Sequence, residues 1–241
     1  MSVHGRFRVA TEKTMFAMPE TAIGLFPDVG MTHVLPRLAG GLGSGFGMYI
    51  GLTGVRLAAA DLRFVGLATH ALQSAALPPL QAALAREPAN AAAILAESEA
   101  HAGLPGTSKL EAAAAAIARC FGEQHASVES IVEALAADRD AAWAAQTLTL
   151  LRKMSPTSLK VSHRLLRAHA DATLAEALRT EYVVSQRCLK PGADFYEGIR
   201  AVLVDKGAPP ARWVPATLGE VTPALVDAFF RPLSPENQLA L

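Results

Sequence analysis

The chain opens with a short stretch in which apolar and polar residues alternate. Val3, Phe7 and Val9 fall on one side of residues 2–10, and arginines fall between them. A period of two predicts a β-strand, and residues 14–18 read as a second short strand after a polar turn. The pattern therefore predicts two strands at the start of the chain.

Helical spacing takes over after residue 30. Short helices are predicted at 31–38, at 46–52 and from 57 to about 66, followed by a short strand at 67–70. Pro36 lies inside the first of these helices, and proline lacks the N–H group that a helix interior needs. We expect that helix to be irregular.

Beyond the two prolines at 78 and 79 the composition shifts to alanine-rich helices. Four of them have side chains at their starts that can accept a hydrogen bond from the first turn. These predicted caps are Ser108 with Glu111, Ser127, Ser155 before Pro156, and Thr173 with Glu176. The proline-spaced tail predicts an extended strap, anchored by Trp213, before a last short helix.

Two or three short strands followed by many helices do not make a complete sheet, because strand edges need hydrogen-bonding partners. The sequence therefore predicts an α/β fold that continues a larger domain. We expect two parts: 1–75, which holds the remainder of the α/β core, and 76–241, which is helical and ends in the strap.

Composition excludes several function classes. The chain has 241 residues, 51% of them apolar, with 22 Lys plus Arg against 22 Asp plus Glu. A balanced charge gives no footprint for nucleic acid. The two cysteines lack any partner motif, so neither a disulfide framework nor a metal site is predicted. No apolar run is long enough to span a bilayer, and the start carries no signal-peptide pattern.

Two carboxylates stand out in an otherwise apolar segment. Glu20 and Asp28 each directly follow a proline, and Gly24 and Gly30 allow sharp bends between and after them. An acid held by a rigid backbone among apolar residues has a perturbed pKa, which acid/base chemistry requires. The alternative from spacing alone is that Glu20 caps a helix and Asp28 supports a turn.

The remaining chemically active side chains favour structural roles. The histidines have no serine or cysteine partner in a recognisable motif, the basic residues fit a solvated helix face better than a phosphate site, and the cysteines fit helix packing. These residues are His4, His33, His70, Lys153, Lys160, Arg164, Cys120 and Cys188.

Several ordered motifs together resemble one known family. They are Ser-Val-His-Gly at 2–5, Phe-Ala-Met-Pro-Glu-Thr-Ala-Ile-Gly-Leu-Phe-Pro-Asp-Val-Gly at 16–30, Leu-Thr-Gly at 52–54, Gly-Leu-Ala-Thr-His at 66–70, Met-Ser-Pro-Thr-Ser-Leu-Lys at 154–160, Glu-Tyr at 181–182, Asp-Phe-Tyr-Glu-Gly at 194–198 and Trp-Val-Pro at 213–215. The chain resembles the 3-hydroxyisobutyryl-CoA hydrolase branch of the enoyl-CoA hydratase/isomerase (crotonase) superfamily. The resemblance covers most of the chain and is weakest at about 72–140.

This resemblance implies the C-terminal part of a crotonase (ClpP/crotonase-like) spiral core with a few short strands, followed by a largely α-helical region. It implies hydrolysis of 3-hydroxyisobutyryl-CoA in valine catabolism, with Glu20 and Asp28 as catalytic acids. Glu20, Asp28 and Gly24 would contact the substrate. Neither a cofactor nor a metal is implied, since CoA is part of the substrate.

The chain also departs from the family pattern. The two segments that supply oxyanion-hole N–H donors precede the Ser-Val-His-Gly motif in the family, and here that motif begins at residue 2. Losing one such donor costs about a hundred- to a thousandfold in rate, so we expect impaired activity in a chain without them. A non-catalytic, partner-binding remnant and an enoyl-CoA hydratase/isomerase are therefore the alternatives.

The expected partner is an acyl-CoA, with no nucleic acid or membrane, and the sequence leaves room for an oligomer. The resemblance implies the mitochondrial matrix for a eukaryotic source and the cytoplasm for a bacterial one, with no targeting segment in these residues.

Overall fold

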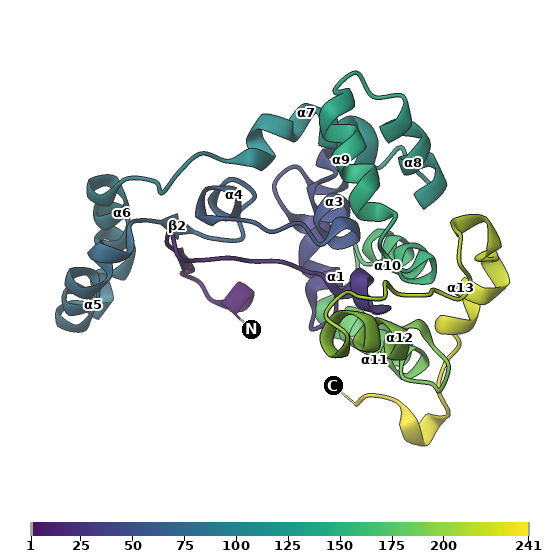
Figure 1. The fold of residues 1–241 in the computed structure, drawn as a ribbon. Helices are drawn as coiled ribbons and strands as arrows, with labels where there is room; N and C mark the ends of the chain where they lie inside the picture. Colours follow the sequence, from purple (N-terminus) through teal and green to yellow (C-terminus); the bar gives the residue numbers. More distant parts are fainter. Residues whose placement is uncertain (1, 241) are drawn as a thin grey trace. The chain divides into compact units, whose positions relative to one another are not determined.

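The computed structural model describes residues 2–240, which group into two compact units (Figure 1). The first unit takes in the residues up to Ala17 and Arg56–Ala114, and the second takes in Met18–Val55 and the residues from Ala115 onward. Each unit is therefore built from two separate stretches of chain.

The first unit contains two short strands and three helices, namely β1 (Val9–Ala10), α4 (Ala59–Phe64), β2 (His70–Ala71), α5 (Leu77–Arg86) and α6 (Ala91–Ala102). The second unit contains α1 (Met31–Val34), α2 (Gly41–Ser44), α3 (Phe46–Thr53), α8 (Val128–Ala136), α9 (Ala141–Leu151), α10 (Pro156–Ala168), α11 (Leu174–Cys188), α12 (Asp194–Ile199) and α13 (Pro223–Phe229). Helix α7 (Lys109–Phe121) begins in the first unit and ends in the second.

Short 3₁₀ turns connect many of these elements. They are η1 (Ser2–His4), η2 (Glu20–Ile23), η3 (Leu35–Arg37), η4 (Ser74–Ala76), η5 (Pro88–Asn90), η7 (Leu218–Glu220) and η8 (Pro235–Asn237). A π-helical turn, η6 (Arg200–Val204), continues α12.

The first unit is organised around a small parallel ladder. Val9 of β1 pairs with His70 of β2, and Ala10 pairs with Ala71. Behind the ladder, the buried side chains of Leu72, Leu80 and Leu95 form a core that joins β2 to α5 and α6. Figure 1 shows α5 and α6 side by side.

The strands are shorter than the alternation of residues predicted. The strand expected over 2–10 forms only at Val9–Ala10, and the one expected over 14–18 is reduced to a single antiparallel bridge between Phe16 and Leu57. A strand persists only where its main-chain groups find a partner, and among residues 2–240 the two paired strands are two residues long.

Two of the three short helices predicted before residue 67 form as expected, and the third is divided. Helices α3 and α4 confirm those expected at 46–52 and from 57 onward. The helix expected at 31–38 splits into α1 and η3, because Pro36 has no N–H to donate to the carbonyl four residues earlier.

The predicted caps are confirmed at the starts of α7, α8, α10 and α11. The acceptor hydroxyls are those of Ser108, Ser127, Ser155 and Thr173, and each accepts from the amide three residues later at 3.0–3.3 Å. Thr173 and Glu176 form the complete reciprocal box, since the Thr173 amide donates to the Glu176 carboxylate at 2.7 Å.

The expected division at residue 75 stays a prediction about where the family core ends. Contacts group the chain differently, since 18–55 lie with the C-terminal helices and 77–102 lie with the short strands. Sequence order gives no sign of this because the grouping depends on which buried faces meet.

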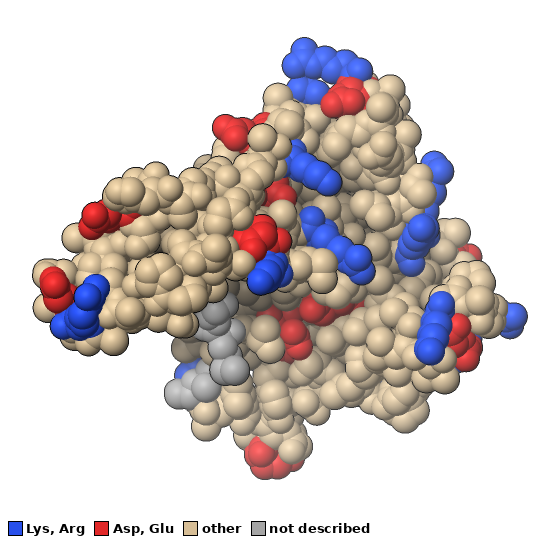
Figure 2. Space-filling view, turned by 60° about the vertical axis from the view of Figure 1, so that its left-hand side comes forward, with Lys and Arg blue, Asp and Glu red and all other residues tan. Residues whose placement is uncertain are grey.

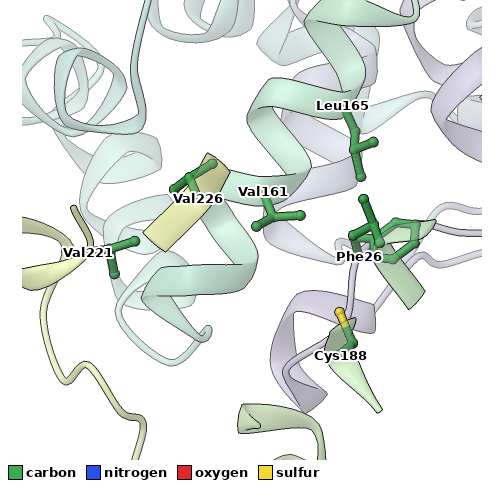
Figure 3. Packing of buried hydrophobic residues seen from close by; sticks show 7 residues of the cluster. Phe26, Val161, Leu165, Cys188, Val221 and Val226 are labelled. Carbon is green, nitrogen blue, oxygen red and sulfur yellow. The ribbon is translucent and has the colours of Figure 1, made fainter. Parts of the chain in front are cut away.

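In the second unit, α10 packs against α1, α3, α8 and α13. Phe26 contributes a fully buried ring to this core, and Figure 3 shows it between Leu165 of α10 and Cys188 of α11. Val161, Val221 and Val226 complete the cluster with Val184. Residues 25 and 26 of the acid-bearing segment are thereby tied to the helices.

The C-terminal strap is held where the sequence predicted. Trp213 Nε1 donates to the carbonyl oxygen of Lys153 at 3.1 Å, and the Val214 amide donates to Asp194 at 2.9 Å. Acidic and basic side chains are interspersed on the face shown in Figure 2. Within residues 2–240, no helix combines the length and apolar character needed to cross a membrane.

Two glycines bring main chains into direct contact in the second unit. A Cβ atom added at Gly24 would lie 2.3 Å from the carbonyl carbon of Asp194, and one added at Gly198 would lie 2.3 Å from that of Ile23. The turn η2 and helix α12 therefore touch backbone to backbone, with no space for a side chain at either glycine.

We predict that Gly198→Ala destabilises the protein by roughly 3 kcal/mol, because the added methyl group must displace main chain. Helix propensity alone would favour alanine at this helical position, so the loss tests the contact itself. Gly219→Ala is the control, since nothing lies within 4 Å of its added Cβ. Urea unfolding followed by circular dichroism measures both, and equal midpoints would contradict the prediction.

Candidate active site

Glu20 and Asp28 both lie in the segment 18–30, which we call the acid loop. Glu20 is the first residue of η2, directly after Pro19, and Gly24, whose φ is 72°, caps the end of η2. The amide of Leu25 donates to the Glu20 carbonyl oxygen at 2.9 Å, which closes the turn. The backbone at Glu20 is thus fixed locally by a rigid proline and a tight turn.

Tertiary hydrogen bonds fix the same turn from two other elements. Thr21, which is fully buried, donates its hydroxyl to the Leu52 carbonyl oxygen of α3 at 3.1 Å. The Ser155 amide, at the start of α10, donates to the Thr21 carbonyl oxygen at 3.0 Å. The backbone next to Glu20 is therefore held in place by hydrogen bonds to both α3 and the start of α10.

The Glu20 carboxyl group is poorly solvated. The side chain is half-buried, and among the residues that the structure describes its Oε2 atom is buried without a hydrogen-bond partner. Loss of hydration, with a smaller contribution from the negative charge of Asp28, raises the pKa of Glu20 to about 7. The group is poised to exchange a proton near neutral pH.

Asp28 follows two buried residues, Phe26 and Pro27, and is itself half-buried. Desolvation raises the pKa of Asp28 above its usual range. A turn does start here, because the Met31 amide donates to the Asp28 carbonyl oxygen at 2.9 Å. Main-chain atoms make that bond, so the carboxylate is not needed for it.

A third acid, Glu181 of α11, lies directly behind the acid loop. Its buried carboxylate accepts hydrogen bonds from the amides of Gly30 at 2.8 Å and Thr32 at 3.1 Å, and from the Thr32 hydroxyl. Burial raises the pKa of Glu181, while these three donors oppose that shift. The residues immediately after Asp28 are thereby attached to α11.

In the sequence, Glu181 is part of the Glu-Tyr motif at 181–182, and that motif predicted no role for its carboxylate. A signal was present: Ala177, Glu181, Val184 and Cys188 follow one another at helical spacing, and all four are buried. A charged residue on an otherwise apolar stripe indicates a specific polar partner elsewhere in the fold.

Gly24 was expected to contact substrate, and that role stays a prediction. The structure gives an additional reason for glycine here, since its φ is 72° and the Asp194 backbone occupies the place of a side chain. A cavity of about 160 Å³ opens beside Gly24, lined also by Phe26, Thr157, Cys188 and Asp194 among others, and neither Glu20 nor Asp28 lines it.

The other candidate residues take part in structural contacts. His33 and His70 bond the Ala172 carbonyl oxygen and the Thr69 hydroxyl at 3.1 and 2.9 Å. Lys160 and Arg164 pair with Glu129 and Asp227, each at 2.5 Å.

Four further candidates differ in exposure. Cys120 and Cys188 are buried in α7 and α11, as expected for helix packing, and Lys153 and His4 are exposed. Among residues 2–240, no cluster of three His, Cys, Asp or Glu side chains could hold a metal ion.

Three comparisons with known proteins bear on this site. The family model described as enoyl-CoA hydratase/isomerase matches residues 1–230. Proteins named 3-hydroxyisobutyryl-CoA hydrolase, mitochondrial, are 44% identical, in Danio rerio over 100% of this chain and in Homo sapiens over 97%. The chain spans 62% and 60% of those two relatives, respectively.

Solved structures share the fold. A carnitinyl-CoA dehydratase from Mycobacterium thermoresistibile superposes with a TM-score of 0.83 at 37% identity, over 97% of this chain and 64% of that one. An enoyl-CoA hydratase from Rhodobacter sphaeroides gives 0.80 at 33% identity, over 100% and 66%. The expected α/β crotonase fold is thereby confirmed, and the chain belongs to the enoyl-CoA hydratase/isomerase family.

Proposed function

We propose that the chain acts as an acyl-CoA thioester hydrolase that converts 3-hydroxyisobutyryl-CoA to 3-hydroxyisobutyrate and CoA in valine catabolism. The observation that carries the proposal is the half-buried Glu20 carboxyl, with one oxygen unpartnered among the described residues and a pKa of about 7. The names of relatives that are 44% identical supply the substrate.

Glu20 acts as the base in this proposal. Its carboxylate accepts a proton from water, the oxygen of that water bonds to the thioester carbonyl carbon, and the C–S bond then breaks. The CoA sulfur leaves as a thiolate and takes up a proton. A carboxylate whose pKa lies near 7 suits proton transfer at neutral pH better than an ordinary glutamate. The alternative mechanism has the Glu20 carboxylate attack the thioester carbonyl carbon directly, as a nucleophile.

Asp28 holds the substrate hydroxyl. An ionised carboxylate accepts a hydrogen bond from a β-hydroxyl group, and a site built to bind that group rejects acyl chains that lack it. Asp28 also keeps the Glu20 pKa high through its charge. Gly24 contacts the acyl chain in this proposal from the edge of the cavity that it lines. No cofactor enters these steps, and the CoA moiety belongs to the substrate.

A second function is addition of water to an enoyl-CoA. The solved structures with TM-scores of 0.83 and 0.80 are named as a dehydratase and a hydratase, which favours this alternative. The same pair of acids could move the protons of that reaction. We place hydrolysis first because the hydrolases are the more similar in sequence, at 44% against 37% and 33%.

For the compartment, we propose the mitochondrial matrix if the source is eukaryotic, because the curated relatives are named as mitochondrial. For a bacterial source we propose the cytoplasm.

We predict that the chain releases free thiol from 3-hydroxyisobutyryl-CoA and does not hydrate a short enoyl-CoA. Thiol release is followed with a disulfide reagent, and hydration by loss of the enoyl absorbance, each against an enzyme-free blank. Hydration without thiol release would replace the hydrolase assignment, and inactivity in both assays would favour a non-catalytic role.

We predict that Glu20→Gln lowers thiol release about 100- to 10,000-fold, the range that a general base contributes, while the fold is retained. The control is Glu133→Gln, because Glu133 is an exposed glutamate of α8. Comparable turnover by the two variants would remove Glu20 from the mechanism.

We predict that kcat/KM falls about tenfold per pH unit below pH 7, because protonated Glu20 cannot accept a proton. The free energy of unfolding depends on pH in the opposite direction. Between pH 4.5 and about 7 the folded protein keeps a proton that the unfolded chain has released, so wild-type stability falls as pH rises.

Glu20→Gln removes this linkage, and its gain in unfolding free energy over wild type should be larger at pH 8 than at pH 5. Urea unfolding at both pH values measures the difference. A pH-independent difference would show that Glu20 does not titrate near 7.

A further inference from the structure

The turn that follows Asp28 is conformationally unfavourable. Val29 has φ 53° and Gly30 has φ 84°, so two consecutive residues adopt the left-handed region. Glycine tolerates this conformation, but a β-branched residue rarely adopts it. The Val29 side chain is 65% exposed, so its own packing offers little compensation. Some other interaction must hold the turn.

Glu181 supplies that interaction from α11. Its Oε2 accepts from the Gly30 amide at 2.8 Å, and its Oε1 accepts from the Thr32 amide at 3.1 Å. The two amides lie two and four residues after Asp28, on the far side of Val29. A carboxylate bonded to both fixes where the strained turn ends.

A further donor continues this network. The Thr32 hydroxyl donates to Oε1 of Glu181, so its oxygen is free to accept from His169 Nδ1, which lies 2.8 Å away. Burial lowers the pKa of His169 to about 4, so the ring is neutral. Because the Thr32 hydroxyl proton goes to Glu181, the tautomer with its proton on Nδ1 is the one that fits the His169–Thr32 contact. All the hydrogen bonds then run toward Glu181, and none of its partners competes as an acceptor.

We propose that Glu181, supported by Thr32 and His169, is a positioning residue that holds the strained Asp28–Gly30 turn and thereby the Asp28 carboxylate. This inference rests on the proposed function, in which Asp28 binds the substrate. Glu181 itself reaches the main chain behind the acid loop, and its role is to keep Asp28 in place.

Glu181→Gln tests the proposal in the 241-residue chain. The amide NH₂ meets an N–H donor at Gly30 or Thr32, so at least one of the two bonds is lost. We expect kcat for thiol release to fall about 10- to 100-fold, in line with a misplacement of about 1 Å. KM should rise as well, because a displaced Asp28 holds the substrate hydroxyl less well. Amide hydrogen exchange at Gly30 and Thr32 should accelerate at least about tenfold.

Relief of the strain gives a second, independent readout. Glycine adopts φ 53° without penalty, so Val29→Gly added to Glu181→Gln should recover at least about threefold in kcat. A purely structural role for Glu181 does not predict this rescue. Thr147→Val is the control, because Thr147 is a buried hydroxyl of α9 remote in sequence from the acid loop. It should leave kcat and the exchange of Gly30 and Thr32 unchanged.

Wild-type kcat in Glu181→Gln, or unchanged exchange at Gly30 and Thr32, would overturn the proposal. If Glu181→Gln does not fold, Thr32→Val replaces it. That variant keeps the carboxylate and must still lower kcat and speed exchange, or the proposal fails. If the wild-type chain releases no thiol, the proposed function fails by itself, and the exchange experiment still decides whether Glu181 holds the turn.

Discussion

Main-chain contact between the η2 turn and α12 is the constraint on which the candidate site depends. Gly24 lies against the backbone of Asp194, and Gly198 lies against that of Ile23, so the turn carrying Glu20 is seated without intervening side chains. Close packing of this kind leaves the turn little freedom to shift. The hydrogen bonds of Thr21 to α3 and α10 then fix its orientation.

The close main-chain packing of η2 against α12 explains how one loop can carry two poorly solvated acids. Burial of Glu20 and Asp28 raises both pKa values, which means that their ionised forms oppose folding. Phe26 offsets part of this cost by placing a fully buried ring between α10 and α11. The loop therefore combines an anchor that favours folding with two acids that do not, a pattern typical of functional sites.

Glu181 and Glu20 differ in how many hydrogen-bond donors surround their carboxyl groups. Glu181 is 4% exposed and has three hydrogen-bond donors, whereas Glu20 is half-buried and keeps one oxygen without a partner among the described residues. A buried carboxylate surrounded by donors is suited to holding structure. A carboxylate that lacks hydrogen-bond donors, such as that of Glu20, is suited to taking a proton from a ligand.

The sequence by itself determined the local features. It placed the caps at Ser127, Ser155 and Thr173, the helices α3 and α4, and the two acids between prolines and glycines, because each depends on residues a few positions apart. Only the tertiary structure decided how long the strands are, that Glu181 holds the turn after Asp28, and why Gly198 must lack a side chain. Those features depend on main-chain partners, donors and free space that distant residues supply or occupy, from 61 positions away for Val9 and His70 to 175 for Ile23 and Gly198. Local spacing carries no record of them.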